Sequence, residues 1–591
     1  MAPTHRSVSE TVARYLLYVT VGLVTLEAVV DVAPAVPLDW LAVVTMGAFV
    51  ATAVTRFVDS TGREAAERER EYGQPSTRAV LATLFGLCLV GGVLRGYALG
   101  AQSFWFDEAI SANAAIALIE DGRPTFPSGD TYWRGVPHTL VVAGSMAIFG
   151  TGEVAARLPS VGFGIATIGV TYWLGRDVGG NRVGLLAAAL VTFATWEIAW
   201  SRQVRMYQQF QLLYTLSLVL FVRVERTWFA EWRSGIALVV VIVGAALTHE
   251  IGYVLVPVAV AYLGLAGLLD GRLSRRVAAG LVGCSLGFAT VVELGTGVVS
   301  NAIERIVTTH VSYWEAYAAW LTGEFHGVFL LGIVGMGLLL YRGRHRAGLL
   351  LVIAVVAPVW VLSFYTELFA TRYLYFGLPV LFLWAAVTID VVAIAAVERG
   401  REIASRFENT DSVTARVDGD TATTVAACLV AGGIAVLLAS GGGFTVAPQA
   451  AYELGPNAPQ PDFAGAYDHV NDRREPGDVI VAGWTAPGVY YAGGVDYWLA
   501  HDLSGIDGDW TVNGSERYAG AEPIVGADEL ETVVDDHERG WIVVDEIALA
   551  RQDQDTRAAL DEHEVEHERG GMTVYSWDHS DGGDSSPDGS Y

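Results

Sequence analysis

The sequence predicts a polytopic α-helical membrane protein of about 13 spans, followed by a small α/β domain. Of its 591 residues, 52% are hydrophobic and 17% are charged, and the mean hydropathy is +0.39. Apolar runs recur from the first residues to about residue 440, and each approaches the roughly 20 residues that a helix needs to cross a bilayer. After residue 450 the chain becomes acidic, with 31 of the 64 Asp and Glu residues, which indicates a water-exposed domain.

Residues 1–78 are expected to contain two additional N-terminal spans and a cytoplasmic loop. The stretch 56–78 contains five arginines. Cytoplasmic loops of membrane proteins carry an excess of positive charge, so we place this stretch inside the cell. The two preceding spans then put the N-terminus in the cytoplasm as well.

The core of the membrane region is expected over residues 79–441. Its first span, at 79–99, leaves the cytoplasm, so the loop 100–136 is extracytoplasmic. An odd number of crossings must then lead to the next basic turn. The apolar stretch 137–150 is short for a span, so we interpret it as an interfacial or re-entrant helix and expect 158–175 to cross the membrane.

The segment 451–579 is predicted to fold as a separate extracytoplasmic α/β domain. Its expected strands are 478–483, 541–550 and 572–577, and its expected helices are 525–537 and 553–566. The tail 580–591 is rich in Gly, Ser and Asp and is expected to be disordered.

The charge of the chain indicates a highly saline environment. The formal net charge is −27, and every basic residue other than histidine is arginine. Many surface carboxylates keep proteins soluble at high salt, so we expect a halophilic archaeal source and a place in its cell membrane. The sequence shows no basic face, which excludes nucleic acid as a partner.

Two adjacent carboxylates, Asp107 and Glu108, follow an aromatic triplet in the stretch "SFWFDEAIS" of the first extracytoplasmic loop. Neighbouring residues on a helix point about 100° apart, so the two acids cannot both face one substrate atom. We therefore predict that Asp107 acts as a base, while Glu108 bonds to the backbone or to a metal ion. The structural alternative is that the pair only caps the following helix, whose dipole favours acids.

Further polar side chains fall near the same predicted face of the membrane. They are Arg134, Arg157, Arg205, Tyr207, His249, Glu250, Arg372 and Tyr373. Ionisable groups beside spans cost several kcal/mol unless they are paired or hydrated, so they are functional candidates. Arginine in particular presents planar donors that match phosphate geometry. Each residue also has a structural alternative, such as a snorkelling anchor for Arg157 or an interhelical histidine for His249.

Several short motifs in order resemble one family of membrane enzymes. "FWFDEAIS", "AARLPSVGFG", "SRQVRMYQQF", "LTHEIGYVLVP" and "TRYLYFGLPVLFL" follow one another with similar spacing. They resemble the glycosyltransferases that take sugars from polyprenyl phosphates, which include the protein O-mannosyltransferases and the lipid A aminoarabinose transferases. The resemblance implies the C-type glycosyltransferase fold and an inverting transfer of a sugar outside the cytoplasm.

The resemblance also implies roles for the site residues. Asp107 and Glu108 would form the catalytic pair, with Asp107 as the base. The donor phosphate would bind Arg134, Arg157, Arg205 and Arg372, and the substrates would contact Tyr207, His249, Glu250 and Tyr373. If a divalent cation such as Mg²⁺ or Mn²⁺ takes part, Asp107 and Glu108 would hold it, but an arginine-rich site can also act without a metal.

The expected donor is dolichyl-phosphate mannose, and the expected acceptor is an N-glycan or a protein. The C-terminal domain lacks the Trp-Trp-Asp motif of the oligosaccharide-transferring relatives, which favours transfer of a single sugar. The alternative function is a flippase or transporter of polyprenyl-linked sugars, which would also need arginines and acids within a helical bundle.

Overall fold

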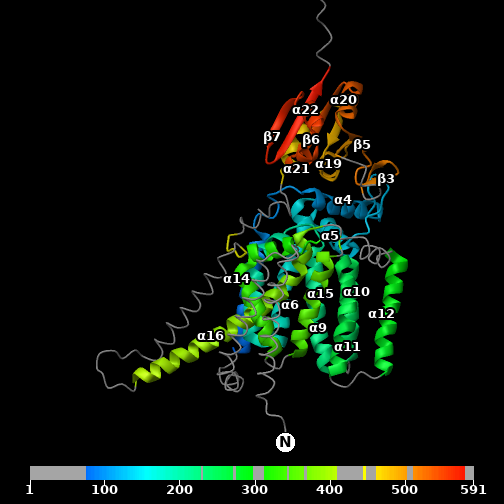
Figure 1. The fold of residues 1–591 in the computed structure, drawn as a ribbon. Helices are drawn as coiled ribbons and strands as arrows, with labels where there is room; N and C mark the ends of the chain where they lie inside the picture. The colour runs from blue at the N-terminus through cyan, green and yellow to red at the C-terminus, as the bar shows by residue number, and fades with distance from the viewer. Residues whose placement is uncertain are drawn as a thin grey trace, which may run out of the picture.

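In the computed structural model, a bundle of helices carries a mixed α/β domain at one end (Figure 1). The structure describes residues 75–227, 231–269, 275–296, 312–341, 345–364, 366, 369–408, 443–447, 461–501 and 510–579. The two expected N-terminal spans, the end of the expected membrane core (409–441) and the tail 580–591 lie outside these residues.

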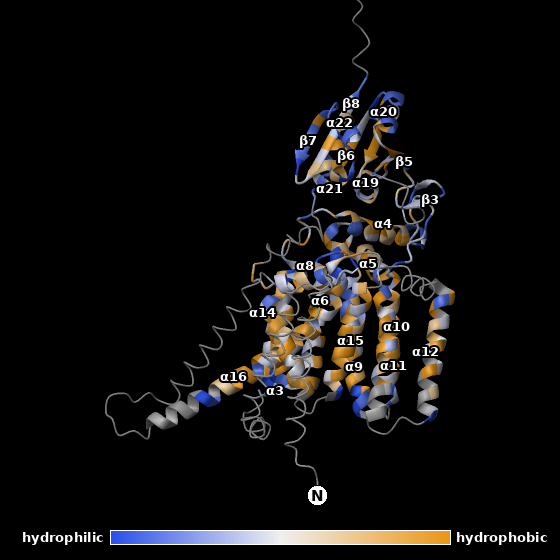
Figure 2. Cartoon of the chain, in the orientation of Figure 1, coloured by the Kyte–Doolittle hydropathy of each residue, from blue (hydrophilic) through white to orange (hydrophobic). Residues whose placement is uncertain are grey.

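The bundle is built from apolar helices, and the chain is a multi-pass membrane protein. Among the described residues, the segments long and apolar enough to cross a membrane belong to α3 (Thr77–Gly96), α6 (Glu153–Gly179), α14 (Trp314–Tyr341), α15 (His345–Phe364) and the pair η2 (Thr371–Gly377) and α16 (Leu378–Glu408). The other bundle elements are α5 (Val136–Phe149), α7 (Asn181–Phe193), α8 (Thr195–Trp200), α9 (Tyr207–Thr227), α10 (Trp232–Thr248), η1 (Glu250–Val254), α11 (Leu255–Leu269) and α12 (Arg275–Thr296). Hydrophobic residues dominate these helices, whereas the α/β domain is more hydrophilic (Figure 2).

The helix α5 occupies the stretch for which the sequence predicted an interfacial or re-entrant helix. It has 14 residues, so it is about 21 Å long, and the hydrocarbon core of a bilayer is roughly 30 Å thick. In contrast, the following helix α6 has 27 residues and is among the segments long enough to cross. The helix α5 lies at the end of the bundle that faces the α/β domain (Figure 1).

The α/β domain contains a six-stranded mixed sheet in the order β5-β2-β1-β6-β8-β7. Its strands are β1 (Val479–Ala482), β2 (Tyr497–Ala500), β5 (Glu522–Val525), β6 (Arg539–Asp545), β7 (Glu564–Arg569) and β8 (Met572–Asp578), and a separate hairpin joins β3 (Thr511–Val512) to β4 (Ser515–Glu516). Strands β5, β2, β1 and β6 are parallel, and β8 and β7 add antiparallel pairs. The helices are α18 (Phe463–Arg473), α19 (Thr485–Ala492), α20 (Ala527–Asp536), α21 (Glu546–Arg551) and α22 (Gln554–Leu560).

Two boundaries in this domain differ from the sequence prediction. The expected strand 541–550 ends at Asp545, because the Asp545 carboxylate accepts a 2.7 Å hydrogen bond from the N–H of Ala548 and starts helix α21. The expected helix 553–566 ends at Leu560, and the chain continues into β7, which pairs with β8.

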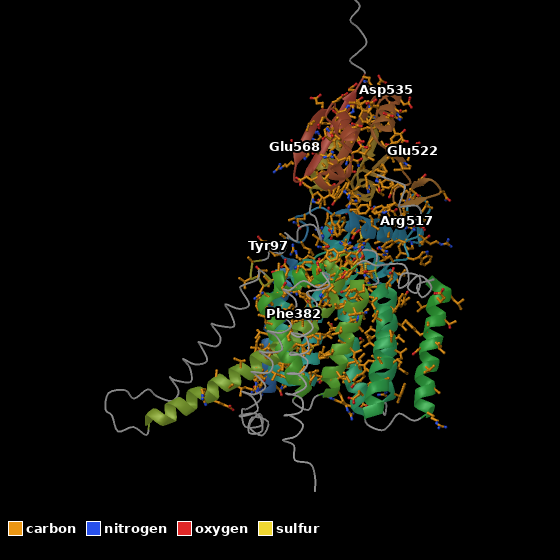
Figure 3. All side chains as sticks on the ribbon, in the orientation of Figure 1. Tyr97, Phe382, Arg517, Glu522, Asp535 and Glu568 are labelled. Atoms are coloured by element: carbon orange, nitrogen blue, oxygen red, sulfur yellow. The ribbon has the colours of Figure 1, made fainter. Side chains whose placement is uncertain are left out.

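The α/β domain is attached to the loop region above the bundle through α4 (Phe106–Asp121) and the segment that precedes it. The Ser103 hydroxyl donates to the carbonyl of Pro461 at 2.9 Å, and the Asn113 amide donates to the carbonyl of Ala486 at 2.9 Å. Arg517, which is labelled in Figure 3, pairs with Asp130 at 2.6 Å. These contacts place the domain directly over the beginning of α4.

Candidate active site

The two acids of the first loop lie in the first turn of α4. Helix α4 begins at Phe106, and Trp105 precedes it in an extended conformation. Acids at this position are stabilised because the N-terminal end of a helix carries a partial positive charge. Stabilisation of the helix end, the structural alternative considered for the pair, therefore applies to both acids. Their side chains, however, have different partners.

Glu108 is completely buried in a two-point ion pair with Arg157. Arg157 donates from Nε to Oε1 of Glu108 at 2.9 Å and from Nη2 to Oε2 at 2.6 Å. The N–H of Val204 also donates to Oε1 at 2.8 Å. The carboxylate thus joins α4 to α6 and to the turn before α9.

Arg157 has no donor directed toward open space. Its remaining hydrogen bonds go to the backbone carbonyls of Leu99, Gln102 and Ser103, at 2.8–3.1 Å. Its side chain is only 4% exposed. The structure therefore gives Arg157 and Glu108 the geometry of an internal clamp. The bond from the N–H of Val204 is a backbone contact of the kind predicted for Glu108.

Asp107 points away from this clamp and toward two other arginines. Its Oδ2 lies 3.4 Å from Nη2 of Arg205 and 3.9 Å from Nη2 of Arg372. The Asp107 side chain is 17% exposed, so solvent or a substrate can reach it. The structure thus brings together three predicted site residues from α4, the turn before α9 and η2.

One nitrogen of the Arg205 guanidinium, Nη1, has three oxygen acceptors. Its Nη1 donates to the carbonyl of Asp107 at 3.0 Å, to the Ser111 hydroxyl at 3.2 Å and to the Tyr132 hydroxyl at 3.4 Å. Burial opposes the charged form, but Asp107 and then the nearby tyrosines outweigh it and raise the pKa of Arg205. The guanidinium is therefore fixed in position with its full charge.

Arg372 borders an aromatic group that includes three more predicted residues. Its Nε donates to the Tyr207 hydroxyl at 3.1 Å, and its guanidinium lies over the rings of Tyr207 and Tyr373, at 6.0 and 5.9 Å from their centroids. The His249 ring lies 5.4 Å from the Tyr207 ring and 6.1 Å from the Tyr373 ring. Its Nδ1 accepts the N–H of Ile251, so this histidine also orders the start of η1.

Arg134 and Glu250 complete the group of predicted residues. Arg134 is exposed and interacts electrostatically with Glu250, Arg205, Tyr132 and Tyr207. Outside the buried clamp, the site therefore has three guanidinium groups, on Arg134, Arg205 and Arg372, and two carboxylates, on Asp107 and Glu250. This excess of one positive charge suits an anionic ligand.

Sequence reasoning missed two tyrosines of the site, Tyr132 and Tyr518. Tyr132 contacts Arg205, and Tyr518 comes from the α/β domain. Burial and then the Asp107 carboxylate raise the pKa of Tyr518, so its hydroxyl keeps its proton and can donate. No local motif marks Tyr518, because only the docking of the domain brings it near α4.

The side chains do not fit the divalent cation that the resemblance allowed at Asp107 and Glu108. Both oxygens of Glu108 are occupied by Arg157, and Asp107 faces two guanidinium groups. Over the part of the chain that the structure describes, no group of three His, Cys, Asp or Glu residues is arranged to hold a metal ion.

Comparisons with known proteins bear on the fold described above. Residues 137–292 match the family described as dolichyl-phosphate-mannose-protein mannosyltransferase. The solved structure of ArnT from Cupriavidus metallidurans bound to undecaprenyl phosphate superposes with a TM-score of 0.52 at 15% identity, over 85% of this chain and 98% of ArnT. The chain has the C-type glycosyltransferase (GT-C) fold of membrane glycosyltransferases.

A second GT-C structure is similarly close. The oligosaccharyltransferase AglB from Archaeoglobus fulgidus, solved with an inhibitory peptide and a dolichol-phosphate, superposes with a TM-score of 0.54 at 14% identity. That alignment covers 84% of this chain and 74% of AglB. A search of curated protein sequences gave no significant match.

The buried pair between Glu108 and Arg157 is expected to contribute to the stability of the folded protein. Replacing Arg157 by Ala leaves the buried Glu108 carboxylate unpaired, and we expect this to destabilise the folded protein by about 3–5 kcal/mol. The midpoint of thermal unfolding in detergent should fall markedly, and adding Glu108→Gln should recover part of the loss because the buried charge is then removed.

The matched control is Arg176→Ala. Arg176 pairs with Asp177 at 3.4 Å, but its side chain is 42% exposed, and such pairs contribute about 1 kcal/mol or less. Equal losses for Arg157→Ala and Arg176→Ala would contradict a special role for the clamp.

Proposed function

We propose that the chain transfers a single mannose from dolichyl-phosphate mannose to an extracytoplasmic acceptor, an N-glycan or a protein. One observation carries the proposal: an accessible carboxylate, Asp107, lies beside two guanidinium groups that are fixed in position. The GT-C fold and the match to a mannosyltransferase family support it. The lipid phosphates named for the ArnT and AglB structures have the head-group chemistry that this site would bind.

In this proposal Arg205 and Arg372 bind the phosphate of the donor. Arginine forms paired hydrogen bonds with phosphate oxygens. As the bond between the sugar and the phosphate breaks, negative charge grows on the leaving dolichyl phosphate. Preorganised guanidinium groups stabilise that charge in the transition state more than in the ground state. Arg134 adds positive charge at the exposed edge.

Asp107 acts as the general base. Its carboxylate takes the proton of the acceptor hydroxyl while the acceptor oxygen attacks the anomeric carbon from the side opposite the phosphate. One bond forms between the acceptor oxygen and this carbon, the bond to the phosphate oxygen breaks, and the configuration inverts. Tyr207, His249, Glu250 and Tyr373 would line the space for the sugar.

Glu108 and Arg157 act as positioning residues. They fix the first turn of α4 against α6, so that Asp107 is held beside Arg205 and Arg372. This assignment replaces the direct roles that the resemblance implied for the pair.

The Asp107→Asn variant tests the catalytic assignment. The amide cannot accept the proton, so we expect transfer of labelled mannose from dolichyl-phosphate mannose to glycoprotein acceptors to fall at least about 100-fold. Asp121→Asn, at the other end of the same helix, is the matched control and should retain activity.

Retention of transfer by Asp107→Asn would contradict the role of this residue. Movement of labelled lipid across vesicles by the wild-type chain, without consumption of the donor, would instead support the flippase alternative and contradict the transferase.

The proposed location of the site outside the cytoplasm is tested by cysteine labelling. Trp133 is 74% exposed and lies in the loop before α5. Arg176 lies near the C-terminal end of α6, away from that loop. In a variant in which Cys88, Cys284 and Cys428 are replaced by Ala, we expect a membrane-impermeant maleimide to label Trp133→Cys in intact cells. Arg176→Cys should react only after permeabilisation, and the reverse pattern would place the site in the cytoplasm.

A further inference from the structure

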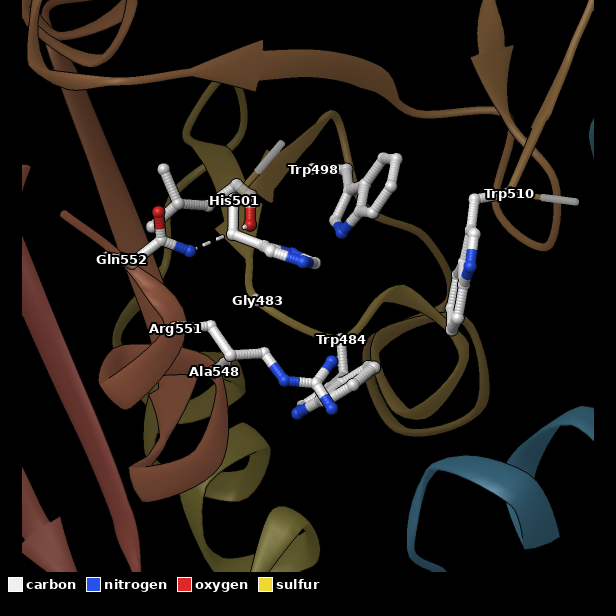
Figure 4. A pocket seen from close by; sticks show the side chains of 9 residues that line it. Gly483, Trp484, Trp498, His501, Trp510, Ala548, Arg551 and Gln552 are labelled. Atoms are coloured by element: carbon white, nitrogen blue, oxygen red, sulfur yellow. Dashed lines mark hydrogen bonds between the residues drawn. The ribbon is translucent and has the colours of Figure 1, made fainter. Parts of the chain in front are cut away.

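The α/β domain contains a pocket that the proposed transfer chemistry does not use (Figure 4). Its lining residues are Gly483, Trp484, Trp498, Leu499, His501, Trp510, Ala548, Arg551 and Gln552. Its empty volume is about 330 Å³, including the space at its open mouth.

The pocket lies where open α/β sheets generally bind ligands. Gly483 and Trp484 follow β1, His501 follows β2, and α21 follows β6, so the pocket is at the carboxyl ends of three parallel strands. From β1 the chain proceeds to β2 and β5 on one side, and then returns to β6 on the other side of β1. The carboxyl-end crevice at such a reversal of strand order is the usual ligand position in this architecture.

Three tryptophans give the pocket its chemistry. The rings of Trp498 and Trp510 are stacked, with their centroids 6.2 Å apart and an interplanar angle of 21°, and the ring of Trp484 lies 6.3 Å from that of Trp510. Aromatic faces carry partial negative charge. They therefore attract the C–H groups on the apolar face of a sugar ring, whose hydrogens carry partial positive charge.

Polar groups stand at the edge of the same pocket. The Arg551 guanidinium lies 5.0 Å from the centroid of the Trp484 ring, and Arg551 and His501 are exposed. Their nitrogens can hydrogen-bond to the hydroxyl groups of a sugar that rests on the tryptophans. A pocket with an apolar floor and a polar rim therefore fits the two kinds of surface that a carbohydrate presents.

The pocket is connected to the candidate active site by aromatic contacts. Phe106 directly precedes Asp107, and its ring lies 4.6 Å from that of Trp484 and 5.8 Å from that of Trp510. The Tyr518 ring lies 5.6 Å from that of Phe106. A glycan chain that occupied the pocket could therefore extend over Phe106 toward the carboxylate.

We propose that this pocket binds a sugar residue within the glycan chain of the acceptor. The enzyme would then extend an existing glycan, with the chain's end at Asp107 and an inner residue on the tryptophans. The inference rests on the proposed function, because it concerns the acceptor of that same transfer. The strongly acidic composition of the domain, with 31 acidic residues and seven arginines after residue 450, disfavours a polyanionic ligand in place of a neutral glycan.

Binding of oligosaccharides to the full chain in detergent tests the pocket directly. The probe is a panel of neutral hexose di- to tetrasaccharides, observed by saturation-transfer NMR and tryptophan fluorescence. We expect saturable binding to the wild type, weakened about tenfold or more in Trp510→Ala and in Arg551→Gln because the stacking surface or the polar rim is lost. Arg569→Gln is the matched control, since Arg569 is an exposed arginine on β7, away from the pocket.

Arg551→Gln provides a second test should Trp510→Ala fail to fold, because Arg551 is an exposed side chain. In transfer assays, both pocket variants should raise the KM for a glycan acceptor while leaving kcat and the KM for the donor close to the wild-type values. Failure of the whole panel to bind the wild type, or equal binding by the wild type and the pocket variants, would overturn the proposal.

The two proposals fail in different assays. If the wild type consumes no dolichyl-phosphate sugar but binds oligosaccharides through Trp510, the proposed transfer is wrong and the carbohydrate pocket stands. If the wild type consumes the donor and the pocket variants transfer to a glycan acceptor with unchanged KM, the transfer stands and the pocket inference is wrong.

Discussion

The buried pair between Glu108 and Arg157 is the interaction on which the site depends. It joins the first turn of α4 to α6, while the remaining donors of Arg157 hold the segment 99–103 that leads into α4. A carboxylate and a guanidinium buried together are stable only when their hydrogen bonds are satisfied, and here both are. Because Glu108 is fixed inside the protein, its neighbour Asp107 must point out of the helix in a different direction.

That direction determines the chemistry available to the site. Asp107 meets Arg205 and Arg372, which arrive from the turn before α9 and from η2, and the surplus positive charge around them suits a lipid phosphate. A polyprenyl chain requires the bilayer, whereas its sugar phosphate requires polar groups at the membrane surface. The end of the bundle beneath the α/β domain supplies such groups. In the proposed transfer, the domain adds Tyr518 and the aromatic pocket, so the acceptor would be held on the side opposite the membrane.

The sequence was sufficient to predict the helical bundle, the α/β domain and the convergence of Asp107, Arg205 and Arg372. Those predictions depended on long apolar runs and on the placement of arginines. Both features can be recognised in short stretches of the sequence. The adjacency of Asp107 and Glu108 also predicted that they differ in role. The partner of Glu108 was not predictable, since the order of motifs does not indicate which arginine turns inward. The pocket was not predictable either, because Trp484, Trp498 and Trp510 are separated in sequence and meet only when the sheet forms.

A structure of the chain with dolichyl phosphate in a lipid nanodisc tests the central claim most directly. Dolichyl phosphate is the expected product, and it carries the phosphate without a transferable sugar. The account predicts that the phosphate oxygens lie within about 3.5 Å of the guanidinium nitrogens of Arg205 and Arg372, with Asp107 on the side where the sugar would be. A phosphate bound away from both arginines, with Asp107 still paired to them, would contradict it.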